Sequence, residues 1–261
     1  MNILTADTGF LTADPGWFQR GSAQYRFDTN SRSHVGRLQT RFGDGKNWGA
    51  SIGLTGKDFG DIRDSALGRM KNTGYPEQNL DVKVETLLSP STHLTFAHQY
   101  LNQDDVWRWH STIYNDTPWN GTSTGSYGAR IYDQERSLTY LKVAGDLIDS
   151  PVRNYSATLS FQRSQDSAFQ DRSATDVRTQ VIDVDTIGLD VQLESDLFDG
   201  NLVYGVDYYR DSIDSAGSRT GRDPRSRRPI ADDSSYHLLG AFAQLRRPVS
   251  YTHLTLPTIV G

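Results

Sequence analysis

The sequence alternates apolar and polar residues with a period of two over most of its length. The clearest runs lie at 48–55 and 155–162, where every second residue is apolar. This alternation is typical of β-strands that bury one face and wet the other. No segment shows the 3.6-residue spacing of an amphipathic helix. The pattern predicts ten strands, at 23–27, 35–42, 48–55, 80–85, 94–101, 138–143, 155–162, 187–194, 202–208 and 237–245.

The connections between these strands are of two kinds. Turn-forming residues mark short connections at 44–46, 89–91, 146–151 and 198–200. Longer polar stretches, which we expect to be loops, lie at 59–78, 105–133, 170–180 and 215–234. From residue 44 onward short and long connections alternate strictly, as do the tight periplasmic turns and long extracellular loops of a transmembrane barrel.

The pattern therefore predicts an all-β fold, an antiparallel transmembrane β-barrel fragment of about ten meandering strands of a larger barrel. Its polar residues would line the lumen and its apolar residues would face lipid. Aromatic residues near strand ends would form the interfacial girdles, namely Trp48, Tyr100, Tyr155 and Tyr208. The alternative is a soluble β-sandwich, for example a carbohydrate-binding one, but sandwich strands usually recur every 8–12 residues with short turns at both ends.

Composition fits strands that are apolar on one face only. Hydrophobic residues make up 36% of the chain and aromatic residues 11%, with 23 glycines. The net charge of −5 argues against a nucleic-acid partner, which requires a clustered basic surface. The chain has no cysteine, which excludes a disulfide framework and a thiolate metal site. No apolar run approaches the ~20 residues of a membrane helix.

The two ends of the sequence differ from the rest. Residues 1–5 lack the basic region and apolar core of a signal peptide, so we expect that an outer-membrane protein of this kind begins further upstream. Residues 248–261 resemble the translation of a transposase-type sequencing adapter read in one frame. The alternative for this segment is an ordinary C-terminal extension.

Several stretches of the sequence resemble the TonB-dependent outer-membrane receptors, especially the branch for haem, haemoglobin or transferrin-type iron uptake. These stretches are Asn47-Trp48-Gly49, Lys57-Asp58-Phe59, Asn72-Thr73-Gly74-Tyr75, and residues 94–99, 133–141 and 203–209. The resemblance divides the chain into the end of a plug domain at 1–15 and the first half of the barrel at 16–247. It also places the long loops outside the cell.

The resemblance implies active import across the bacterial outer membrane. Such receptors are plugged barrels of about 22 strands, without enzymatic activity and without a resident cofactor. The implied partners are outer-membrane lipid, the TonB energy-coupling complex acting through an N-terminal region, and a ligand that is haem, a siderophore or an iron-carrying protein. The alternative function is a passive porin-like or adhesin-like barrel.

One predicted loop carries a cluster of aromatic residues with a histidine. Its members are Trp107, Trp109, His110, Tyr114 and Trp119. Aromatic rings stack on a flat ligand such as haem, and an imidazole coordinates its iron. These residues are therefore the candidate ligand-binding site. Alternatively, the rings pack against neighbouring loops or the membrane rim.

Other polar groups give weaker indications. We predict no catalytic residue and no metal site, because the strand histidines lack paired metal-ligand spacing; they are His34, His93, His98 and His237. A dense acidic set is expected to belong to a wet lumen wall: Asp183, Asp185, Asp190, Glu194 and Asp196. A basic stretch would be a solvated loop or would attract anionic chelates or lipopolysaccharide phosphates: Arg219, Arg222, Arg225, Arg227 and Arg228.

Overall fold

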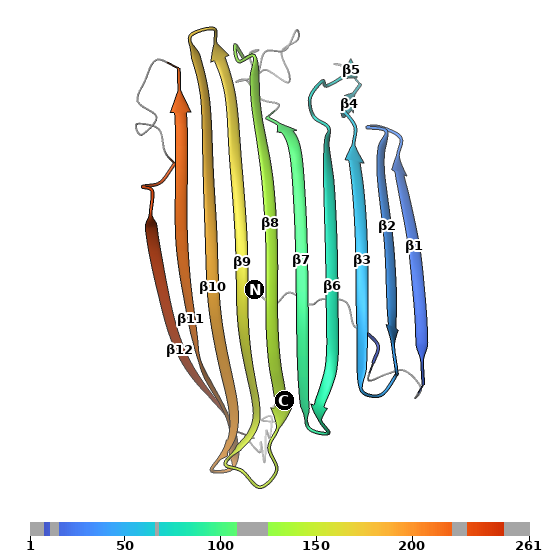
Figure 1. Ribbon diagram of the computed structural model, residues 1–261, viewed down its shortest axis with the longest axis vertical. Helices are drawn as coiled ribbons and strands as arrows, with labels where there is room; N and C mark the ends of the chain where they lie inside the picture. Colours follow the sequence, from blue (N-terminus) through green and yellow to red (C-terminus); the bar gives the residue numbers. More distant parts are fainter. Residues whose placement is uncertain (1–7, 11–15, 66–67, 109–124, 221–228, 248–261) are drawn as a thin grey trace, which may run out of the picture.

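The computed structural model describes residues 8–10, 16–65, 68–108, 125–220 and 229–247. They form one broad antiparallel sheet of ten strands, in a single layer, in which every strand pairs with its neighbours along the chain (Figure 1). The strands of this sheet are β1 (Phe18–Asp28), β2 (Ser33–Gly43), β3 (Trp48–Phe59), β6 (Tyr75–Ser89), β7 (Thr92–Trp107), β8 (Ala129–Asp146), β9 (Val152–Ser173), β10 (Asp176–Leu197), β11 (Gly200–Arg219) and β12 (Ser234–Arg246).

All ten predicted strands are confirmed, and each lies inside one of these longer strands. The strands lengthen across the sheet, from 11 residues in β1 to 22 in β9 and β10. The sequence pattern underestimated their lengths because both faces become polar toward the strand ends. Alternation then disappears, although the backbone remains extended.

The connections lie at two edges of the sheet. The lower edge in Figure 1, here called the turn rim, holds the connections β2–β3, β6–β7, β8–β9 and β10–β11. The opposite edge, here called the loop rim, holds the remaining connections. Between β3 and β6 it carries a two-stranded hairpin that the pattern did not predict, β4 (Arg63–Asp64) with β5 (Gly68–Arg69).

The predicted loop at 170–180 is wrong. Strands β9 and β10 continue through it and meet in a tight hairpin in which Ser173 pairs with Asp176. Likewise, β11 continues to Arg219 in what was predicted to be loop. Short and long connections therefore do not alternate strictly. Polar residues on both faces of these strand ends made them look like loop.

Few apolar side chains are buried within the described part of the chain, and those are mostly small or lie outside the large strands: Phe10, Ala50, Met70, Ala97 and Ala129. Large apolar side chains are instead exposed along the strands; Leu159, for example, is 55% exposed. The sheet thus has no apolar layer packed against it in these residues. Among the described residues there is also no helix long and apolar enough to cross a membrane.

The turn between β2 and β3 shows how the turn rim is built. Asp44 Oδ1 accepts hydrogen bonds from the backbone N–H groups of Trp48, Lys46 and Asn47, at 3.0, 2.9 and 2.7 Å. These bonds hold the pKa of Asp44 far below its usual value. Gly45 adopts a φ of +69°, which the tight turn requires.

Candidate functional site: the two faces of the sheet

Pairing in register shows which side chains share a face, because directly opposed residues project to the same side of an antiparallel sheet. A row of paired residues through Leu54 is apolar or aromatic over β1 to β7: Ala23, Leu38, Leu54, Leu80 and Tyr100. The same row is polar over β8 to β11: Ser137, Arg163, Asp185 and Ser212. The face to which this row projects is here called the apolar face. Its apolar residues do not lie along a single row of paired residues.

The apolar residues form a band that crosses the strands obliquely. On β12, Leu239 lies at the end of the band nearer the loop rim. The row of paired residues that contains Leu239 crosses the sheet through Leu159 and ends at Gln19 on β1. On β1, however, the band reaches Phe27, eight residues further along. At ~3.4 Å per residue this is ~27 Å across nine spacings of ~4.8 Å, an inclination of roughly 30°.

This inclination has a physical meaning. The strands of a transmembrane barrel tilt by about 35–45°, so a lipid layer meets each strand at a different height in the pairing register. A flat apolar layer therefore crosses the rows of paired residues obliquely. A soluble sheet packed on a partner has no such requirement.

Aromatic residues mark both edges of the band. Tyr100 and Tyr208 lie at its loop-rim side, and Trp48 and Tyr155 at its turn-rim side. Two of the predicted girdle residues, Tyr100 and Tyr208, are in the middle of long strands rather than at strand ends. They nevertheless lie at an edge of the band, because the strands extend well beyond it.

The opposite face, here called the polar face, carries ion pairs that cross several strands. Arg37 on β2 reaches over β3 and donates to both carboxylate oxygens of Asp81 on β6, at 2.7 and 3.1 Å. It passes over Gly53: a Cβ built there would lie 2.4 Å from the Arg37 guanidinium. Glycine therefore makes room for a bidentate ion pair across three strands.

Toward the loop rim, Glu77 collects donors from three strands. Lys57 of β3 forms an ion pair with it, Asn79 of β6 donates at 2.8 Å and Gln103 of β7 donates at 2.8 Å. Closer to the turn rim, Lys83 pairs with Glu85 at 2.9 Å. The polar face thus carries hydrogen bonds and ion pairs that link β2, β3, β6 and β7.

A short N-terminal segment is seated on this face. The Thr8 hydroxyl donates to Glu85 at 2.6 Å, and Phe10 lies edge-on to the ring of His93 with centroids 6.4 Å apart. Thr8 and Phe10 are 0% and 3% exposed. Gly49 provides the space, since a Cβ there would meet the Phe10 Cβ at 2.6 Å. The polar face therefore already holds a segment that precedes the sheet.

The candidate ligand-binding cluster lies largely outside the described residues, which include only Trp107 of its members. Trp107 ends β7 and pairs with Ile131. This register places Trp107 on the apolar face, on the side of Phe169. Trp109, His110, Tyr114 and Trp119 lie outside the described residues.

The four histidines named above lie apart, each with its own neighbour. Nδ1 of His34 lies 2.6 Å from the Tyr25 hydroxyl, and Nδ1 of His98 lies 2.9 Å from the Thr139 hydroxyl. Nδ1 of His237 lies 2.8 Å from the Tyr208 hydroxyl. His93 contacts Phe10 on the polar face.

The predicted acidic wall divides between the two faces. Asp190 and Glu194 project from the polar face, and Glu194 accepts from Asn154 at 3.0 Å. Asp183 and Asp185 project from the apolar face above the band, each 3.9 Å from Arg163. Only part of this acidic set therefore belongs to one wall.

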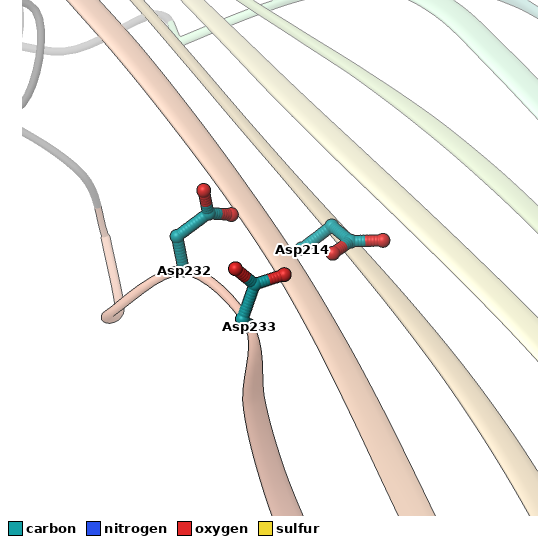
Figure 2. A group of neighbouring side chains, drawn as sticks. All are labelled: Asp214, Asp232 and Asp233. Carbon is teal, nitrogen blue, oxygen red and sulfur yellow. The ribbon is translucent and has the colours of Figure 1, made fainter.

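The structure also brings together three carboxylates that the sequence did not single out. Asp214 of β11 lies beside Asp232 and Asp233, which precede β12 (Figure 2). One oxygen of each lies within 4.8 Å of the others, and all three residues are exposed. Asp232 accepts the backbone N–H of Ser215 at 2.9 Å, which fixes this segment against β11.

No protein-family model matches the chain, and no curated protein sequence matches it either. Its fold matches solved structures. The copper transporter OprC matches with a TM-score of 0.67 and 16% identity, over 88% of this chain and 35% of that one. The ferric yersiniabactin uptake receptor FyuA from Yersinia pestis matches with a TM-score of 0.49 and 10% identity, over 90% of this chain and 39% of that one.

The chain thus spans somewhat over a third of the length of the structures it matches. The OprC match establishes the fold: an all-β, ten-stranded antiparallel meander that corresponds to about a third of the OprC chain. This confirms the fold class predicted from the sequence.

Proposed function

We propose that this chain forms part of the barrel wall of a TonB-dependent importer in the bacterial outer membrane, and that it has no enzymatic role. The oblique apolar band is the observation that carries the proposal. It supports a wall of tilted strands in a flat lipid layer. The apolar face would then contact lipid, the polar face would line the lumen, and the loop rim would face the outside.

The seated N-terminal segment favours an importer over an open pore. In the proposed receptor, residues 1–15 end the plug, and residues 16–247 belong to the barrel. Thr8 and Phe10 would then be the last plug contacts with the wall, made through Glu85 and Gly49. A passive porin needs no segment buried against its wall at this point.

The proposed cargo is an iron chelate or haem, a proposal that rests on the family resemblance. Energy would come from the TonB complex through an upstream region. We retain the 105–133 connection as the candidate haem contact, with Trp109, His110, Tyr114 and Trp119 as its members. Trp107 is the exception, because its register on the apolar face turns it away from the lumen.

Uptake by the full-length protein tests the function. Cells expressing it are given haem, ferric siderophores or copper, in strains with and without TonB; copper is included because OprC transports it. We expect accumulation of an iron compound only when TonB is present. Accumulation that is unchanged without TonB would contradict the importer and favour a porin-like barrel. Uptake of copper alone would contradict the proposed iron cargo and make copper the cargo.

A pair of variants tests the haem contact. W109A/H110A is expected to lose surface haem binding while the barrel still assembles in the membrane. W107A is the matched control and is expected to keep haem binding. Unchanged haem affinity in W109A/H110A would remove this connection from the mechanism.

A further inference from the structure

Five arginines converge at the loop-rim ends of β7 to β11, and they are here called the arginine cluster. Its members are Arg108, Arg130, Arg172, Arg178 and Arg219. Arg130, Gln170, Arg178 and Arg219 form one row of paired residues, and that row belongs to the polar face. The cluster lies around the β9–β10 hairpin, which was predicted to be loop and which reaches the upper edge of the sheet (Figure 1).

One carboxylate organises three of these arginines. Arg178 donates to Asp176 at 3.0 and 2.9 Å, and Arg219 donates to the same carboxylate at 2.7 and 3.0 Å. Arg172 lies 3.7 Å from Asp176, too far for a hydrogen bond. The Arg178 and Arg219 guanidinium groups hold the pKa of Asp176 far below its usual value, so it stays ionised. Three positive charges therefore share one negative charge.

Two tyrosines contact the guanidinium groups of Arg108, Arg130 and Arg172. Arg130 donates to the Tyr132 hydroxyl at 3.1 and 2.9 Å, and the Arg108 guanidinium lies 5.4 Å from the centroid of the same ring. The Arg172 guanidinium lies 4.9 Å from the Tyr127 centroid. A guanidinium group over an aromatic ring is held in place by the ring and keeps its positive charge, as for Arg108 and Arg172.

Within the described part of the chain, Arg172, Arg178 and Arg219 carry more positive charge than Asp176 offsets, and the hairpin does not explain this. A tight turn between Ser173 and Asp176 requires no arginine, and like charges at this spacing repel one another. The nearby carboxylates Asp133 and Asp171 project by register from the opposite face. Arg172 also has a buried Nε atom that makes no hydrogen bond. An oxyanion would satisfy this donor and offset the repulsion.

We propose that the arginine cluster binds a carboxylate- or phosphate-bearing group of the transported ligand before it enters the lumen. The proposal rests on the importer function and names its substrate class: an anionic chelate, with haem, through its two propionates, as one such ligand. Guanidinium groups suit this role because their paired N–H donors match the two oxygens of a carboxylate or phosphate. The polar-face register favours a soluble ligand over a lipid headgroup as the source of the anion.

Citrate, a soluble tricarboxylate, is a simple probe of the cluster. Its affinity for the detergent-solubilised full-length protein is measured by calorimetry at low ionic strength. We expect binding that weakens as salt is added. The variant R172Q/R219Q should weaken it at least about tenfold, since each lost contact is a hydrogen bond between charged groups. The control R153Q/R163Q removes the same charge elsewhere and should bind as the wild type does.

The outcomes separate this inference from the importer function. Absence of citrate binding, or equal binding by both variants, would overturn the cluster even if chelate uptake depends on TonB. Arginine-dependent citrate binding without TonB-dependent uptake would leave the cluster standing and remove the importer. Loss of lipopolysaccharide binding in R172Q/R219Q, with citrate binding unchanged, would make the cluster a lipid site and contradict the proposal.

Discussion

Leu159 lies in the interior of the apolar band, and its replacement by arginine tests where the lipid lies. Its side chain is 55% exposed and is flanked in its row by Leu141 and Leu189, each 43% exposed. In water, an exposed leucine changed to arginine alters the free energy of unfolding by less than about 0.5 kcal/mol. In lipid, arginine near the midplane of a barrel costs about 2–4 kcal/mol.

Thr158, the adjacent residue, is the matched control. It projects from the polar face and pairs with Asp190 on one side and Lys142 on the other. An arginine there would meet the Asp190 carboxylate in a wet lumen. We expect T158R to change the free energy of unfolding by no more than about 0.5 kcal/mol, as surface substitutions do.

Urea titration of the full-length protein in phospholipid vesicles measures both variants against the wild type. L159R should lower the folding equilibrium constant by a factor of about 30 to 1,000, which corresponds to its 2–4 kcal/mol. Equal effects of the two variants would refute the assignment of lipid to this face. A larger effect of T158R would show that the faces are reversed.

Four further changes test other parts of the structure. G53A should break the ion pair that passes over this glycine and cost about 1 kcal/mol of stability by chemical denaturation, whereas G56A, where a Cβ has open space, should cost less. D44A should remove stabilisation that is present above the usual aspartate pKa and lost as pH falls through the lowered one, so acid titrations of the variant and wild type should converge only at very low pH. D61A should speed proteolysis between β3 and β6: burial would raise the pKa of this carboxyl, but bonds from two backbone N–H groups and an arginine lower it and hold the connection. G49V should unseat the N-terminal segment and make cells more permeable to large antibiotics; unchanged permeability would contradict its role as a plug contact.

The sequence predicts the strands well because their apolar residues lie on one face and their polar residues on the other. Where the two faces differ in this way, as from Trp48 to Leu54, period two is strong and the strand is found. The same logic fails in the hairpin around Ser173. There polar residues occur on both faces, so nothing in the residue pattern separates extended strand from loop. Only pairing with β8 and β11 reveals the strand.

The sites were harder to predict because they depend on register. The five arginines come from strand ends separated by as many as 111 positions, from Arg108 to Arg219, and no local motif joins them. Trp107 illustrates the converse. It belongs by sequence to an aromatic cluster, but its pairing with Ile131 turns it toward the apolar face. A shift of one residue in the pairing register moves a side chain to the opposite face, and the composition of a segment does not reveal its register.

Depth-dependent spin-label accessibility tests the central claim most directly. This chain contains no cysteine, so single cysteines along β1, β3, β9 and β12 are the only labelling sites in it. In lipid vesicles, labels on the apolar face should be reached by oxygen and labels on the polar face by a water-soluble nickel complex, with a period of two. Relative to the rows of paired residues, the position of highest oxygen accessibility should also shift by about eight residues between β1 and β12, as the oblique band requires. Uniform accessibility along the strands, or maxima that stay on a single pairing row, would contradict a wall of tilted strands in the membrane.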